Sequence, residues 1–161
     1  MSSLTFASAL RENQQEVLQR WLAAYHGHVA EDFEQMLGTP MGRAVAVSFL
    51  GLAVELMGSE EYQYSQILHR ARQAAQDDAY RRTAVGFCLP DLVTHASSFR
   101  TALEETIFNH VSPNSAKQAE ELRSAVMAIN RFGDTLVAGE IAGYFAYRQF
   151  SEKDEGDGRA A

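Results

Sequence analysis

The side chains of this sequence that could take part in chemistry are few and scattered. Besides one cysteine, Cys88, the chain contains five histidines: His26, His28, His69, His95 and His110. No His-Glu-x-x-His or Glu-x-x-His pattern occurs, and such patterns place metal ligands on one face of a helix. A glycine-rich phosphate loop and a Ser/His/Asp set are also missing. The sequence therefore predicts no metal site and favours a protein that is not an enzyme.

Two histidines fall on the longer predicted helices in the middle of the chain. His69 or His95 could ligate haem in a globin-like helical pocket, and the aromatic end of the last helix offers Tyr144 as a lining residue. A hydrogen-bonded or surface histidine is the commoner explanation, and aromatic side chains more often pack in a core or a dimer. We therefore expect no cofactor, and we keep a ligand- or haem-binding globin-like protein as the alternative.

Glu140 is the carboxylate that stands out, because it interrupts an apolar stripe. The stretch from Ser115 to Phe150 contains no proline, and a helix of this length would be about 54 Å long. The positions of this stripe, most of them apolar, recur at alternating spacings of four and three, which is a heptad pattern. They are Leu122, Val126, Ile129, Gly133, Leu136, Glu140, Gly143, Tyr147 and Phe150.

Glycines in that stripe permit another backbone to come close, and a carboxylate within it needs a partner. We therefore predict an interface that holds two copies together and relays a signal. Its residues are Ile129, Gly133, Leu136, Glu140, Gly143 and Tyr147. On this interpretation Leu136→Asp would break the dimer. The alternative is a helix rotated so that Glu140 reaches solvent.

The rest of the chain is predicted to be helical. We expect helices over Leu4–His26, 30–37, Met41–Met57, Tyr62–Asp77 and Thr83–His110, with a break at Asp77–Tyr80 and an interruption near Gly86–Leu89 before Pro90. The fold class is an all-α, single-domain bundle of about six helices with a long C-terminal helix, and a globin-like arrangement is one form of it. Residues 1–150 form the helical domain, and residues 151–161 are expected to be a disordered acidic tail or linker.

Composition narrows the classes of partner. A chain of 161 residues with 46% hydrophobic and 22% charged residues is typical of one globular domain. The net charge of −7 argues against nucleic acid and against an anionic membrane surface. The most apolar stretch, Ala44–Met57, is too short to span a bilayer. A single cysteine and a start without a signal peptide fit a cytoplasmic location.

Three segments resemble one family of bacterial signalling domains. The run Leu10–Leu22 is similar to the opening helix of the RsbT co-antagonist (RsbR-type) N-terminal domains of stressosome proteins, which also precede sensor histidine kinases. Thr39-Pro40-Met41-Gly42 resembles that family's Asn-Pro-Val/Ile-Gly turn. Tyr144-Phe145-Ala146-Tyr147-Arg148 is similar to its final helix, which leads to an output domain. The resemblance covers most of residues 5–150.

This resemblance implies a helical sensory module, usually dimeric, that transmits a signal along its last helix to a downstream signalling protein or output domain. Related RsbR domains resemble globins that lack haem, which counts against a haem here. No anti-sigma-antagonist domain or kinase follows residue 150 in this sequence. We therefore expect either a piece of a larger protein or a version that acts through a separate partner.

Overall fold

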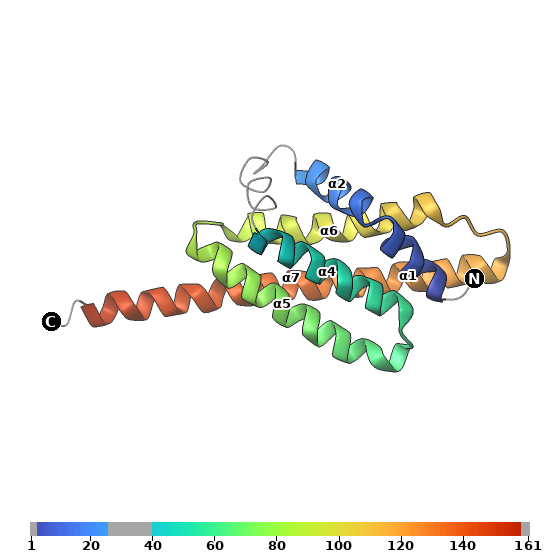
Figure 1. The fold of residues 1–161 in the computed structure, drawn as a ribbon. Helices are drawn as coiled ribbons and strands as arrows, with labels where there is room; N and C mark the ends of the chain where they lie inside the picture. The colour runs from blue at the N-terminus through green and yellow to red at the C-terminus, as the bar shows by residue number, and fades with distance from the viewer. Residues whose placement is uncertain (1–2, 26–39, 159–161) are drawn as a thin grey trace.

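The computed structural model describes residues 3–25 and 40–158, and these form an all-α, single-domain bundle (Figure 1). This confirms the predicted fold class, and no strand occurs within the described ranges. The predicted helix over residues 30–37 lies outside them. Within the described residues, the α-helices are α1 (Ser3–Glu12), α2 (Gln14–Tyr25), α4 (Pro40–Gly58), α5 (Tyr64–Ala84), α6 (Leu89–His110) and α7 (Ala116–Gly158), with a short 3-10 helix, η1, at Glu61–Gln63.

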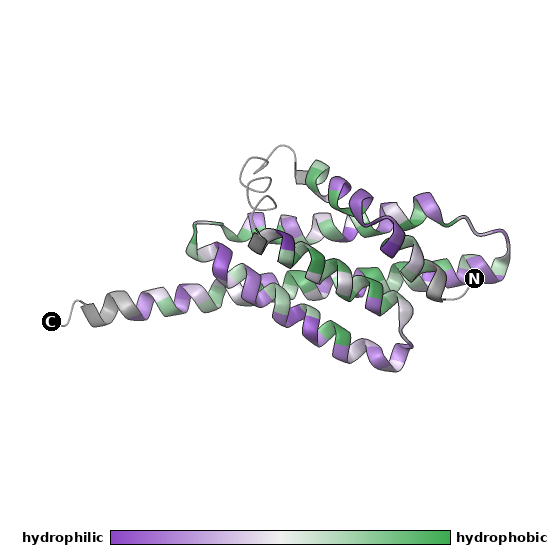
Figure 2. Cartoon of the chain, viewed as in Figure 1, coloured by the Kyte–Doolittle hydropathy of each residue, from purple (hydrophilic) through white to green (hydrophobic). Residues whose placement is uncertain are grey.

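Helix α7 is the axis of the bundle. Helices α5 and α6 pack along it, α4 packs on α1 and α5, and α2 packs on α6. Figure 2 shows α4 as an almost uniformly hydrophobic helix, whereas α5 carries many hydrophilic residues. The side chains that fill the centre are fully buried and mostly aromatic or branched, and they include Trp21, Phe49, Phe99, Phe132 and Leu136.

The first predicted helix is in fact two. A single helix was expected over Leu4–His26, but the structure separates α1 from α2 at Asn13. The Asn13 side-chain amide donates to the carbonyl of Ala9 at 2.8 Å. Asparagine side chains compete in this way with the backbone for hydrogen bonds, which is why they favour helix ends.

Helix α5 is continuous where a break was predicted. The break was placed at Asp77–Tyr80, but α5 runs through these residues to Ala84. Asp78 and Ala79 face the interior, and Asp78 forms an ion pair with Arg82 one turn later, a spacing that supports a helix. The interruption before Pro90 is confirmed: Gly86 adopts a positive φ of 102°, and α6 begins at Leu89 with Pro90 in its first turn.

Helix α7 has 43 residues and is therefore about 65 Å long. Ser115 caps its start, because Ser115 Oγ accepts a hydrogen bond from the backbone N–H of Gln118 at 3.2 Å. The helix continues to Gly158, so residues 151–158 are helical and not a disordered tail, while the alternative that they form a linker stays a prediction. None of the described helices combines the length and the hydropathy needed to cross a membrane.

Candidate functional site: a buried polar cluster

Four charged or titratable side chains meet inside the bundle. Asp78 and Arg82 come from α5, His95 from α6 and Glu140 from α7. Asp78 and Arg82 are 5% and 4% exposed, and His95 and Glu140 are 0% exposed. We call these four residues the buried polar cluster. Such groups are rarely fully buried unless they are paired or bound to a metal.

The atoms of the cluster are close enough to act on one another. Arg82 forms an ion pair with Asp78 across 2.8 Å. His95 Nδ1 lies 3.6 Å from Glu140 Oε1, which is longer than a hydrogen bond. One nitrogen of His95 and one oxygen each of Asp78 and Glu140 all lie within 4.8 Å of one another. Neither oxygen of Glu140 accepts a hydrogen bond from any residue that the structure describes.

Two glycines on α7 bring Glu140 to this position. A Cβ atom at Gly139 would lie 2.5 Å from the backbone oxygen of Arg72, and one at Gly143 would overlap the backbone oxygen of Gln76. Both of these partners belong to α5. The pair Gly139 and Gly143 therefore lets α5 and α7 approach backbone to backbone on either side of Glu140.

Aromatic rings enclose the histidine. The ring of Trp21 lies 4.5 Å from that of His95, centroid to centroid, and the ring of Phe49 lies 6.5 Å from it. The indole N–H of Trp21 donates to the backbone oxygen of His95 at 3.0 Å. Trp21 thus ties α2 to α6 and fixes the surroundings of the imidazole.

Burial dominates the electrostatics of the cluster. It raises the pKa of Glu140 well above its usual value, and the charge of Asp78 adds to this rise, whereas Arg82 opposes it. Burial likewise lowers the pKa of His95 well below its usual value, as does the charge of Arg82. The pKa of Asp78 is raised by burial in spite of its ion pair with Arg82. Each shift follows from the cost of a charge away from water.

The residues predicted to contact a second copy lie inside this chain instead. Ile129, Gly133, Leu136, Glu140 and Gly143 are all buried in the protomer. Gly133 meets the side chain of Arg100 on α6, and Gly143 meets α5. The heptad stripe therefore packs against α5 and α6 of its own chain, and Leu136→Asp would disrupt the core rather than test a dimer.

Tyr147, the last residue of that prediction, is half-buried. Its ring packs edge-on against that of Tyr80, 5.3 Å away between centroids. It is thus also a contact between α7 and α5. Glu140 does not reach solvent either, so the alternative of a rotated helix is wrong as well.

The three residues of the predicted ligand pocket are not brought together. His69 is exposed on α5, His95 is fully buried, and Tyr144 is half-buried with its ring against Phe145. The rings of Trp21 and Phe49 pack around the fully buried His95 ring. The residues present do not fit a haem.

Sequence reasoning missed Asp78 and Arg82, although a signal was present. Ala71 and Ala75 are buried on α5, and the same face continues at spacings of three and four to Asp78 and Arg82. The predicted break at Asp77–Tyr80 concealed this continuation. A charged pair four residues apart on the inward face of a helix is the pattern that could have identified half of the cluster.

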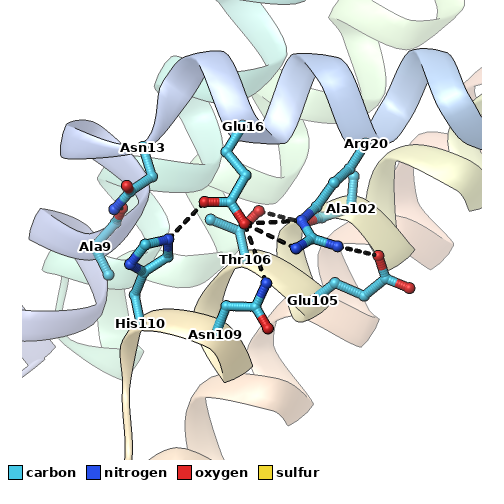
Figure 3. Close-up of polar contacts among 9 residues, drawn as sticks. All are labelled: Ala9, Asn13, Glu16, Arg20, Ala102, Glu105, Thr106, Asn109 and His110. Carbon is cyan, nitrogen blue, oxygen red and sulfur yellow. Dashed lines mark hydrogen bonds and ion pairs between the residues drawn. The ribbon is translucent and has the colours of Figure 1, made fainter.

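A second polar group lies at the surface, between α2 and α6 (Figure 3). Glu16 accepts hydrogen bonds from His110 at 2.5 Å, Asn109 at 3.2 Å and Arg20 at 2.9 Å, and Arg20 also binds Glu105 at 2.9 Å. We call these residues the surface network. The bonds from His110, Asn109 and Arg20 lower the pKa of Glu16 to about 2.

The described part of the chain also contains cavities away from the buried polar cluster. One of about 460 Å³ lies between α1, the end of α4 and the starts of α5 and α7, and its lining includes Phe6, Met57, Tyr64 and Lys117. A more polar one of about 550 Å³ lies between α4 and α5, next to Glu55 and Arg70. Neither is lined by His69, His95 or Tyr144.

Comparison with models of protein families, with curated proteins and with solved structures found no match to this chain.

Proposed function

We propose that this chain is a non-enzymatic sensory domain of bacterial signalling that forms a homodimer and relays a signal to a partner through α7. The observation that carries this proposal is the course of α7. At Glu140 this helix contributes to the buried polar cluster, and it then continues to Gly158. In Figure 1 its last turns project beyond the loop that joins α5 to α6.

The projecting turns of α7 support a role in binding a partner. Helices without tertiary packing are marginal in water when they are short. Tyr147 packs edge-on against Tyr80 of α5, whereas Phe150, three residues later on α7, is 54% exposed. A second protein surface would supply the packing that these turns lack.

A different face of α7 from the one predicted is available for dimerisation. Met127, Ile141 and Phe145 lie on one side of the helix, at spacings of fourteen and four, and they are 58%, 37% and 50% exposed. We call this the outer face of α7. Methionine and aromatic residues are enriched at the centres of protein interfaces.

The buried polar cluster supplies an element that a signal could act on. Its members come from three helices, so a change in its charge or occupancy would alter how α7 packs on α5 and α6. A signal shifts such an equilibrium only if it stabilises one arrangement more than the other. Buried charged groups commonly cost stability relative to an apolar core. The single cysteine leaves no intrachain disulfide to form, which supports a cytoplasmic setting.

Sedimentation velocity over a range of concentrations tests the dimer. We expect the wild-type chain to sediment as a dimer and Phe145→Glu as a monomer, with an unchanged helical circular dichroism spectrum. Val47→Glu is the matched control, because Val47 is 63% exposed and belongs to α4, not to the outer face of α7. A monomeric wild type, or a Phe145→Glu variant that dimerises as well as the wild type, would overturn the proposal.

A further inference from the structure

We propose that Asp78, His95 and Glu140 form a binding site for one divalent transition-metal ion of the Zn²⁺ or Mn²⁺ type. This site is independent of the dimer proposed above, because all three ligands belong to one chain and lie inside it. The ion would join α5, α6 and α7 at the centre of the bundle.

The donor set and its spacing fit such an ion. One imidazole and two carboxylates suit Zn²⁺, Fe²⁺ and Mn²⁺. Two ligands that each lie about 2.0–2.1 Å from a tetrahedral Zn²⁺ are about 3.3 Å from each other. The separation of 3.6 Å between His95 Nδ1 and Glu140 Oε1 is close to that value. The three ligand atoms, all within 4.8 Å of one another, need only a small contraction to bind one ion.

Glu140 provides a second, separate indication of a ligand. Its side chain is 0% exposed, and neither of its oxygens accepts a hydrogen bond from the described residues. A buried carboxylate that accepts no hydrogen bond lowers the stability of the fold. The close approach of α5 and α7 at Gly139 and Gly143 holds it there. A metal ion would supply the missing partner.

The surrounding residues have the positions of a supporting shell. Arg82 binds Asp78 at 2.8 Å, and a carboxylate can contact an arginine and a metal at once because it has two oxygens. Trp21 packs on the His95 ring and binds its backbone oxygen. With both carboxylates ionised, Arg82 compensates only one of the two negative charges, and a cation would offset the other. Arg82 also repels that cation, so we expect weaker binding than at a structural zinc site.

The decisive experiment uses Mn²⁺ as a paramagnetic probe on the wild-type chain. Trp21 is the single tryptophan of the sequence, so its indole N–H gives one resolved NMR signal. Because this N–H is bonded to the His95 backbone, Mn²⁺ in the cluster would broaden the signal at one equivalent, after a long equilibration that allows for burial. Zn²⁺ should reverse the broadening by competition and raise the melting temperature. The measurement is repeated in a His26→Ala/His28→Ala background, which removes the histidines flanking Gly27 that could hold a stray ion.

Variants then assign the ligands. We expect His95→Gln and Glu140→Gln to weaken Zn²⁺ binding by at least about 10- to 100-fold, measured by calorimetry, while His69→Gln on the surface of α5 binds like the wild type. An indole signal that Mn²⁺ leaves sharp would overturn the proposal, and so would equal binding by wild type and His95→Gln. If a variant does not fold, the NMR result on the wild type decides alone. None of these results depends on whether the chain is a dimer.

Discussion

The two polar groups of this molecule use the same residue types in opposite surroundings. In the surface network, Glu16 accepts hydrogen bonds from three side chains and has a pKa lowered to about 2. In the buried polar cluster, Glu140 accepts none from the described residues and has a pKa raised well above its usual value. The hydrogen bonds of Glu16 account for its presence, because they hold α2 against α6. Glu140 is buried and makes no such bonds, so stabilising the fold does not account for it, and a functional role is more plausible there.

The largest expected effect comes from breaking the ion pair in the buried polar cluster. Asp78→Ala leaves the Arg82 guanidinium buried without its partner, and we expect this to cost about 3–5 kcal/mol of the free energy of unfolding. Urea denaturation in the presence of a chelator measures the change. Asp77→Ala, one residue away and exposed, should stay within about 0.5 kcal/mol of the wild type.

A double variant sharpens this result. Replacing the pair with apolar residues, as in Asp78→Leu/Arg82→Met, should recover most of the loss, because an apolar pair avoids the cost of burying charge. If Asp78→Ala were no more destabilising than Asp77→Ala, the interior would tolerate an isolated charge, and the contrast with the surface network would fail.

The next effect tests the close packing that keeps water out of the buried polar cluster. Gly143→Ala would place a methyl group against the backbone of Gln76, and backbone cannot move aside as a flexible side chain can. We expect a loss of about 1–3 kcal/mol in the free energy of unfolding, measured by denaturation. The control is Gly51→Ala on α4, where an added Cβ meets nothing within 4 Å. This variant should raise the free energy of unfolding by about 0.5–1 kcal/mol. A stabilised Gly143→Ala would show that α5 and α7 are not locked together.

Much of the fold could be predicted from the sequence because its signals are local. Pro40 begins α4, Pro90 lies in the first turn of α6, and Ser115 caps α7, and these residue types are typical of helix starts. The errors arose where tertiary contacts decided the outcome. Asp77–Tyr80 looks like a break, but the inward Asp78 has its partner within the helix, and α5 continues.

The candidate site was harder to predict for a physical reason. A periodic stripe shows that one side of α7 is buried but not what covers it, because a neighbouring helix and a second copy bury apolar surface in the same way. Ile129 and Leu136 were therefore assigned to the wrong partner. Asp78, His95 and Glu140 lie on three different helices, so no spacing along the sequence brings these three residues together.

The smallest effect concerns the surface network, and its sign follows from the pKa of Glu16. This pKa falls from 4.5 to about 2 on folding. The ionised form is therefore favoured in the folded state, and its contribution to stability is present above about pH 4.5 and is lost as the pH falls towards 2. Glu16→Gln should melt at a lower temperature than the wild type at pH 7, and the difference should shrink steadily between pH 4.5 and 2.

Added salt distinguishes the stabilisation that comes from the charge of Glu16 from stabilisation by side-chain packing. The side chains of Glu16 and Arg20 are about one third exposed, so salt should screen part of the interaction and narrow the gap in melting temperature at pH 7. Glu12→Gln, an exposed position at the end of α1, controls for the loss of one negative charge. If the difference in melting temperature between wild type and Glu16→Gln changed with neither pH nor salt, Glu16 would stabilise the fold through packing and not through its charge. The contrast between Glu16 and Glu140 would then fail, because the hydrogen-bond partners of Glu16 would not be what stabilises its ionised form.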